Sequence, residues 1–115
     1  MNTKIYHNSR CSKSRATLAI LEQNNVNFDV VNYLVNPPSE SEFKKILNDL
    51  GMSARDILRK GESKYKELVL SNKSLSEEDL IRAMLEFPIL IERPIVRTEK
   101  GVVIGRPPEN ILSII

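Results

Sequence analysis

The sequence predicts an α/β fold built on a mixed β-sheet. Segments with the pattern of strands and helices alternate at the start, a mainly helical stretch fills the middle third, and two short strands come near the end. The predicted order is β-α-β-α, a helical insert, then β-β-α. A strand, helix and strand in succession favour a parallel pair with a right-handed crossover. Two strands joined by a short turn favour an antiparallel hairpin, so we expect both kinds of pairing in one sheet.

The first half of the chain is predicted to contain two strands and two helices. The first strand alternates polar and apolar residues, and two prolines end the second, because proline cannot donate to a ladder. The helices have apolar residues at helical spacing, and Ser39 with Glu42 has the spacing of a capping box. In order, these elements span residues 4–6, 12–24, 28–34 and 39–50.

The second half is predicted to be helical at first and to end with a hairpin and a helix. Ser53 is a candidate cap for a short helix, and Ser76 with Asp79 opens a stronger one that Pro88 ends. Helical segments are expected over 53–58, 63–68, 76–87 and 109–114, and strands over 95–97 and 102–104. Because no long linker interrupts the 115 residues, we predict one domain over 1–115.

Composition narrows the classes of function. The chain has 17 Lys+Arg and 15 Asp+Glu, a net charge of +2, which disfavours nucleic acid as the main partner. No apolar run approaches the roughly 20 residues of a membrane span, and no secretory leader opens the chain. We therefore expect no membrane partner and a cytoplasmic location. One Cys and one His exclude an internal disulfide and a four-ligand zinc site, so we expect no metal centre.

The single cysteine, Cys11, lies where the first strand passes into the first helix. A helix N-terminus presents unpaired N–H groups and partial positive charge, which favour a thiolate over a thiol. Arg10, Lys13 and Arg15 add cationic charge, so we expect the pKa of Cys11 to be low. A free cysteine often packs as a small buried hydrophobe, but three neighbouring cations favour a reactive thiol. The same helix end can hold a tetrahedral oxyanion.

The residue three positions after Cys11 is Ser14, so this chain has no second thiol to resolve a mixed disulfide. A covalent adduct on Cys11 therefore has to be released by an external thiol, such as glutathione, or by water.

Three arginines and one histidine are further candidates for a site. Arg59, Arg93 and Arg106 could bind an oxyanion, because guanidinium groups make paired, directed hydrogen bonds to such ligands. Taken singly, each arginine is more often a solvated surface residue. His7, four residues before Cys11, could orient the loop or tune the thiol, although a lone histidine is more often a structural hydrogen-bonding residue.

A strand followed by a cysteine and a helix is the arrangement of thioredoxin-like and glutaredoxin-like folds. The chain resembles the glutaredoxin-dependent arsenate reductases of bacteria, and in particular the short members of that family. The matches are Tyr6-His7-Asn8, Arg10-Cys11, Ser14-Arg15, Tyr33-Leu34, Pro37-Pro38, Leu58-Arg59-Lys60, Tyr65, Glu67-Leu68, Pro88, Glu92-Arg93-Pro94-Ile95-Val96 and Gly105-Arg106-Pro107.

The resemblance implies a role for each candidate residue. Cys11 would be the nucleophile, and Arg59, Arg93 and Arg106 would hold and stabilise the oxyanion adduct. His7 matches the family histidine near the nucleophile, and the bond between Arg93 and its following proline matches one that is cis in such folds.

The resemblance also implies a reaction. The thiolate attacks arsenate and expels hydroxide or water, glutathione then attacks the arsenic, and electrons pass to it. Glutaredoxin removes glutathione from the cysteine, and arsenite is released. The expected partners are arsenate or a similar oxyanion, glutathione as co-substrate, and glutaredoxin; no bound cofactor is expected.

Two departures from the family leave the substrate open. Ser12 and Lys13 follow the cysteine where well-studied members have a smaller residue such as Gly and no Lys, and this chain stops at Ile115, short of the longer enzymes. One alternative is a glutathione-linked thiol–disulfide oxidoreductase on the same fold. Another is a non-enzymatic, redox-responsive regulator, although such sensors commonly use Cys-x-x-Cys, and Ser14 stands at the second position here.

Overall fold

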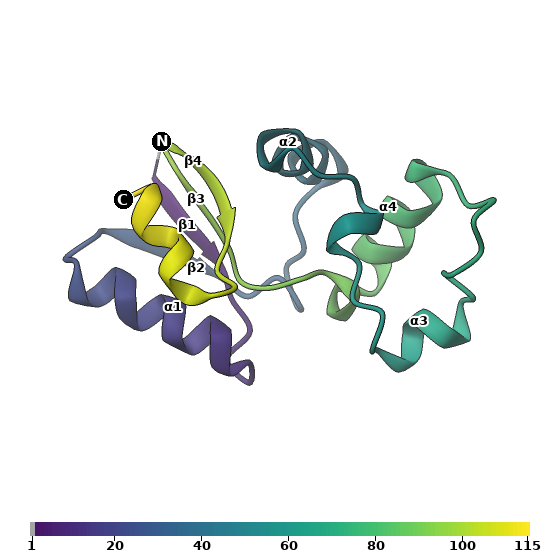
Figure 1. Ribbon diagram of the computed structural model, residues 1–115, viewed down its shortest axis with the longest axis horizontal. Coiled ribbons are helices and arrows are strands. Elements are labelled where there is room, and N and C mark those ends of the chain that lie inside the picture. Colours follow the sequence, from purple (N-terminus) through teal and green to yellow (C-terminus); the bar gives the residue numbers. More distant parts are fainter. Residues whose placement is uncertain (1) are drawn as a thin grey trace. The chain divides into compact units, whose positions relative to one another are not determined.

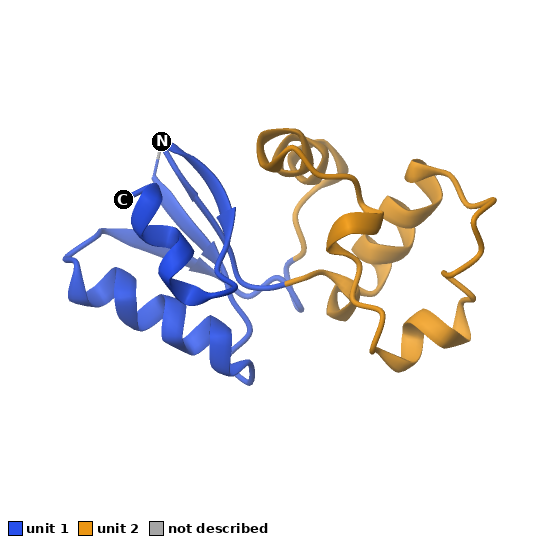
Figure 2. Ribbon diagram, in the orientation of Figure 1, with its two compact units in different colours: residues 1–36, 93–115 blue, residues 37–92 orange. Residues whose placement is uncertain are grey.

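The computed structural model describes residues 2–115, and the chain forms two compact units (Figures 1 and 2). The first unit combines the N-terminal residues up to Asn36 with Arg93–Ile115, and the second is Pro37–Glu92. The second unit corresponds to the second predicted helix and the predicted helical insert. That the whole chain is one domain stays a prediction. Within residues 2–115, no helix combines the length and apolar character that crossing a membrane requires.

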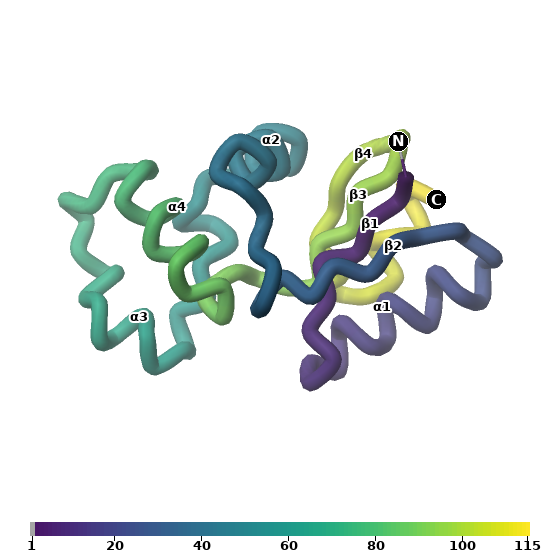
Figure 3. The backbone as a smooth tube through the Cα atoms, turned by 180° about the vertical axis from the view of Figure 1, so that it is seen from behind, coloured from purple at the N-terminus to yellow at the C-terminus, as the bar shows by residue number. Residues whose placement is uncertain are grey.

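The first unit contains a four-stranded sheet in the order β2-β1-β3-β4, with β1 between β2 and β3 (Figure 3). β1 pairs parallel with β2, while β3 pairs antiparallel with both β1 and β4. The predicted mixed sheet, with its parallel pair and its hairpin, is therefore confirmed. The strands are β1 (Thr3–Tyr6), β2 (Phe28–Val31), β3 (Ile95–Thr98) and β4 (Gly101–Ile104).

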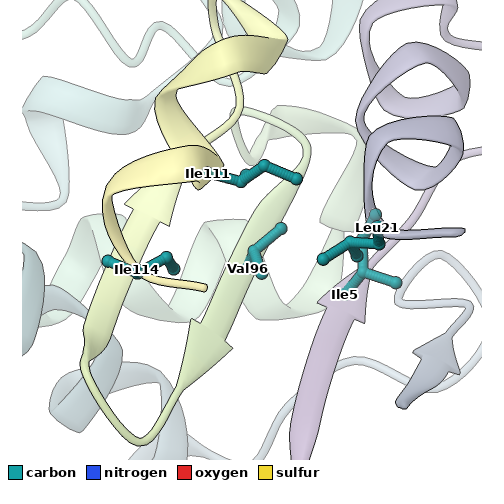
Figure 4. Close-up of a cluster of buried hydrophobic side chains, with 5 residues drawn as sticks. All are labelled: Ile5, Leu21, Val96, Ile111 and Ile114. Atoms are coloured by element: carbon teal, nitrogen blue, oxygen red, sulfur yellow. The ribbon is translucent and has the colours of Figure 1, made fainter. Parts of the chain in front are cut away.

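Helix α1 (Ser12–Gln23) and the 3₁₀ helix η3 (Pro108–Ser113) pack against each other and against the sheet (Figure 1). The side chains of residues that pair directly between β1 and β3 point to the same face of the sheet. These two strands therefore present one apolar surface to both helices. Each aliphatic side chain fully buried there contributes roughly 1.5–3 kcal/mol. Figure 4 shows the resulting core, which is formed by Ile5, Leu21, Val96, Ile111 and Ile114.

Strand β2 is shorter than predicted: it ends at Val31, whereas the prediction ran to residue 34. The register explains the early end, because Val31 pairs with Tyr6, the last residue of β1. Beyond that point the backbone turns, and the carbonyl of Asn32 accepts the N–H groups of Val35 and Asn36.

The last helix begins near the predicted position, but it is a 3₁₀ helix rather than an α-helix. Its backbone bonds span three residues, from Asn110 N–H to Pro107 O and from Ile114 N–H to Ile111 O. The Asn110 amide also donates to the carbonyl oxygens of Ile104 and Arg106, which ties this tighter helix to the end of β4.

The second unit contains the predicted helical segments with two of the three predicted caps. The short segment that follows Ser53 is a 3₁₀ helix, and its N-cap is Ala54 rather than the predicted Ser53. Ser39 accepts the N–H of Glu42, Gly51 ends the first helix in the left-handed region at φ 68°, and Ser76 forms a capping box with Asp79. The elements are α2 (Glu40–Leu50), η1 (Arg55–Ile57), α3 (Ser63–Glu67), α4 (Glu77–Glu86) and η2 (Pro88–Leu90).

An isolated antiparallel bridge pairs Leu58, the residue after η1, with Ile91, near the end of this unit. The N–H of Arg59 donates to Leu90 O at 2.8 Å, and the N–H of Glu92 donates to Ile57 O at 2.9 Å. Because Leu58 and Ile91 are themselves buried, the bridge is anchored by apolar packing as well as by hydrogen bonds.

Gly105, just after β4, permits a close approach between α1 and the segment that precedes β3. A Cβ at this position would lie 2.5 Å from Thr17 Oγ1 and 2.9 Å from Pro94 Cγ. Both neighbours are fixed, since Thr17 is a buried residue of α1 and Pro94 accepts the Gly105 N–H at its carbonyl.

We predict that Gly105→Ala lowers the free energy of unfolding by about 1–3 kcal/mol, because overpacked sites typically lose that much. Gly61→Ala is a matched control, since no atom lies within 4 Å of a Cβ placed there. The control is expected to change stability by no more than about 0.5 kcal/mol. Urea denaturation measures both, and equal stability of the two variants would contradict the close approach.

Candidate functional site

Cys11 is the N-cap residue of α1, at the end of the loop that follows β1. The loop is held from within by Asn8, which is only 5% exposed. The side-chain oxygen of Asn8 accepts the N–H of Arg10 at 3.0 Å, and its carbonyl accepts the N–H of Cys11 at 3.0 Å. These bonds fix the backbone of Cys11 relative to the start of the helix.

The topology of the sheet brings two of the candidate arginines to the same end. β1 ends at Tyr6, which lies opposite Ile95 at the start of β3, and Ile95 in turn lies opposite Ile104 at the end of β4. The loop that carries the thiol therefore shares one end of the sheet with Arg93, just before β3, and with Arg106, just after β4.

The sulfur of Cys11 lies among groups that favour its anionic form. These are the backbone N–H groups of Ser14 and Lys13 and the guanidinium of Arg93, and Arg106 Nη1 lies 4.0 Å from the sulfur. Arg106 Nη1 also donates to the carbonyl of Arg93 at 3.2 Å. Partial burial raises the pKa of Cys11, but these donors and the charge of Arg93 outweigh burial and hold that pKa below its usual value.

The predicted direction of the pKa shift is confirmed, and so is one of its two predicted causes, the N–H groups at the start of the helix; the other, the charge of the neighbouring cations, is wrong. Lys13 acts through its backbone N–H, and Arg10 and Arg15 are not among the groups that lower the pKa of Cys11. The Arg15 guanidinium donates instead to Ser9 O at 2.9 Å. The charge that lowers the pKa comes from Arg93, which is close to the sulfur in space although distant in sequence.

The peptide bond between Arg93 and Pro94 is cis, as the resemblance implies, and the bond between Arg106 and Pro107 is cis as well. Both arginines near the sulfur therefore directly precede a cis proline.

His7 reaches the helix start through Ser14 rather than through the sulfur. Its Nδ1 lies 2.6 Å from Ser14 Oγ, and the N–H of Asn8 donates to the same hydroxyl at 3.0 Å. Burial, and in addition the charge of Arg15, lowers the pKa of His7, which favours the neutral ring. We assign the tautomer in which the ring proton of His7 is on Nε2. The Ser14 hydroxyl then donates its proton to Nδ1.

Sequence reasoning missed the structural importance of Ser14 and Asn8. Ser14 stands out in the sequence only as the position of an absent second thiol, and Asn8 only as part of the family match. The available signal was position, since a buried hydroxyl in the first turn of a helix is well placed to bond the loop that precedes it.

Arg59 lies in the second unit, between the bridge residue Leu58 and helix α3. Its Nη1 is 2.6 Å from Glu92 Oε1 and its Nε is 3.5 Å from Glu62 Oε2. Leu58, Arg59, Lys60, Gly61 and Glu92 line a cavity of about 330 Å³ in this unit.

Cys11, Arg93 and Arg106, which lie together at one end of the sheet, are suited to attack an electrophilic atom that carries charged oxygens. A thiolate supplies the nucleophile, and guanidinium and backbone N–H groups can hold the oxygens. Across residues 2–115, no group of three or more His, Cys, Asp and Glu side chains is arranged to hold a metal ion.

Comparisons with known proteins agree with this architecture. A protein from Escherichia coli K12 named "Uncharacterized protein YfgD" is 52% identical over 97% of this chain and 95% of its own length. A protein named "Arsenate reductase" from Neisseria meningitidis is 48% identical over 97% of each chain. The structure titled "Arsenate reductase from Vibrio cholerae" superposes with a TM-score of 0.95 at 46% identity, covering 100% of this chain and 98% of the other.

These likenesses confirm the predicted fold class, an α/β thioredoxin-like fold. The model of the ArsC family matches residues 6–114, which is nearly the whole sequence. The chain is therefore a member of the ArsC family.

Proposed function

We propose that this chain is an arsenate reductase, an oxidoreductase that converts arsenate to arsenite through a covalent adduct on Cys11. The observation that carries the proposal is the contact of a low-pKa thiolate with Arg93 and Arg106 at one end of the sheet. Membership of the ArsC family and full-length relatives named arsenate reductase support it.

In the first step the Cys11 sulfur attacks arsenic(V). A sulfur–arsenic bond forms, an arsenic–oxygen bond breaks, and the oxygen leaves as hydroxide or, after taking a proton from solvent, as water. The remaining oxygens carry negative charge, which Arg93 and Arg106 and the N–H groups at the start of α1 can stabilise. The oxidation state of arsenic does not change in this step.

External thiols supply the electrons. Glutathione attacks the adduct and displaces a second oxygen as water, so that arsenic is bonded to two sulfurs. Both arsenic–sulfur bonds then break as a disulfide forms between Cys11 and glutathione, the arsenic keeps one electron pair, and it leaves as arsenite after adding a water molecule. A thiolate of glutaredoxin then attacks the glutathione sulfur and frees Cys11. This sequence suits a chain with one cysteine, which holds no internal thiol for the final exchange.

The remaining candidates have supporting roles in the proposal. That Arg59, a residue of the second unit, also binds the oxyanion stays a prediction. His7 acts through Ser14, whose hydroxyl helps to hold the loop and helix start that carry the sulfur. We place the reaction in the cytoplasm, where glutathione keeps thiols reduced.

We predict that Cys11→Ser abolishes arsenite production and that Arg93→Ala lowers kcat/KM by about 10- to 100-fold. The second figure corresponds to losing a charge-assisted hydrogen bond of about 1.5–3 kcal/mol. Arg15→Ala is a matched control, because that guanidinium donates to Ser9 O. Arsenite formation from arsenate with glutathione and glutaredoxin measures all three. Activity in Cys11→Ser equal to wild type would refute the proposal.

The pKa of Cys11 gives a second prediction. Its alkylation rate should rise with pH to a midpoint below the value of about 8.5 for a free thiol. Arg93→Ala should move the midpoint upward, because it removes a donor and a charge that favour the thiolate. Arg15→Ala should leave it nearly in place. A wild-type midpoint at or above that of the free thiol would contradict the activated thiolate.

The thiol dependence gives a third prediction. With glutathione and glutaredoxin both present, arsenite should form over many turnovers, and omitting either should stop the cycle. Omitting glutaredoxin should leave a mixed disulfide with glutathione on Cys11, which intact-protein mass spectrometry detects. Multiple turnovers with neither thiol would exclude this donor system. If Arg93→Ala kept full thiol exchange but wild type made no arsenite, a thiol–disulfide oxidoreductase would be favoured instead.

A further inference from the structure

Arg10 and Lys13 lie on either side of the nucleophile, yet the site described above does not use their side chains. Both residues are exposed, one in the loop after β1 and one in the first turn of α1. Their bonds come from the backbone: the N–H of Arg10 donates to Asn8 Oδ1, and the carbonyl of Lys13 accepts the Thr17 hydroxyl. Neither side chain forms a hydrogen bond or an ion pair with any residue between 2 and 115.

The end of the first unit that holds the thiol is rich in positive charge. This unit carries eight Lys and Arg residues and four Asp and Glu residues, a net charge of +4, whereas the second unit carries nine and eleven. Of the four acidic residues, only Glu109 is near the thiol end in the chain, three residues after Arg106. The other three belong to the body or the opposite end of the unit: Asp29 in β2, Glu22 in the last turn of α1 and Glu99 between β3 and β4.

The charges of these two exposed side chains are not what activates the thiol. Lys13 lowers the pKa of Cys11 through its backbone N–H, and Arg10 is not among the causes of the shift. Their charges are therefore available to a group that approaches Cys11 from solvent. At physiological ionic strength such attraction extends over about 8 Å, the Debye length.

In the proposed reaction, glutathione is a molecule that has to approach Cys11. It carries two carboxylates and one ammonium group at neutral pH, so it is a net anion. One residue of extended chain spans about 3.3–3.6 Å, so each carboxylate lies at least that far from the glutathione sulfur. Consecutive Cα atoms are about 3.8 Å apart, so long side chains one and two positions from Cys11 can reach these carboxylates.

We propose that Arg10 and Lys13 form a docking site for the carboxylates of glutathione and so favour an anionic thiol over an uncharged one. This inference rests on the proposed function, which names glutathione as the thiol that acts on Cys11. The two anions of the reaction then use different cations, because Arg93 and Arg106 serve the oxyanion. Ion pairs at exposed positions are weak, so the preference is modest and depends on salt.

The test measures how fast a thiol displaces 2-thiopyridine from a mixed disulfide with Cys11, a reaction that needs no arsenate. The attacking thiolate forms a disulfide with the Cys11 sulfur, and the bond to 2-thiopyridine breaks, with its electron pair leaving on the released thione. Absorbance of that product gives the rate. Glutathione is compared with 2-mercaptoethanol, an uncharged thiol, and each rate is divided by that of the same thiol with free dipyridyl disulfide.

Arg10→Gln and Lys13→Gln should each lower the glutathione rate about two- to fourfold, the range of one exposed ion pair, and leave the 2-mercaptoethanol rate unchanged. The double variant should lose about four- to tenfold. Lys13→Arg, which keeps the charge, should keep the wild-type rate. Added salt should reduce the glutathione preference of wild type more than that of the double variant. The alkylation midpoint of Cys11 should stay in place throughout.

The control variant is Lys100→Gln, which removes the same charge from the first unit at the opposite end of the sheet. Lys100 is an exposed residue of the turn between β3 and β4, and its Nζ donates to Ile115 O. Both thiol rates of this variant should equal those of wild type.

The outcomes separate this docking site from the proposed function. An unchanged preference for glutathione in the double variant, or an equal loss of both thiol rates, would show that the docking role is wrong. Slower exchange with glutaredoxin at a normal glutathione rate would assign the two cations to a protein partner instead. A rise in the KM for arsenate as large as that for glutathione would mean that they collect any anion, which also overturns the proposal. If wild type shows the charge preference but makes no arsenite, the docking site stands and the proposed function fails.

Discussion

The contact between the Cys11 sulfur and the first N–H groups of α1 is the interaction on which the site depends. These donors belong to the backbone, so their position is set by where the helix begins and how it is seated. Leu21 seats α1 on the sheet core, and Thr17 lies close against Gly105. The position of the Cys11 sulfur thereby depends on how the whole helix packs.

The charges around the sulfur are assembled by strand topology. β3 runs antiparallel to β1, so β3 begins at the end of the sheet where β1 ends and the loop to Cys11 starts. β4 runs back to the same end, which is how Arg106 reaches the segment of Arg93. A parallel β3 would have carried Arg93 to the opposite end. The mixed character of the sheet is thus a requirement of the site.

Much of the fold could be predicted, because local signals determine it: the Ser39 and Ser76 caps and the stop at Gly51 depend on nearby residues. The end of β2 at Val31 could not, because it depends on the length of β1. For the site, the reactive thiol and two arginines near it were predicted. The part that Arg93 plays in the low pKa of Cys11 was not predicted, since Arg93 is far from Cys11 in sequence, and neither was the pairing of Arg59 with Glu92.

The buried hydroxyl of Ser14 limits how this chain could evolve. Its position is the one at which a second cysteine would convert the site to internal dithiol chemistry. Yet the side chain is fully buried and serves both Asn8 and His7. A thiol is a weak donor and acceptor, so Ser14→Cys would weaken both bonds that hold the loop to the helix. A single substitution at this position would therefore weaken the loop that carries Cys11, so the proposed dependence on a thiol from another molecule is not removed by one change.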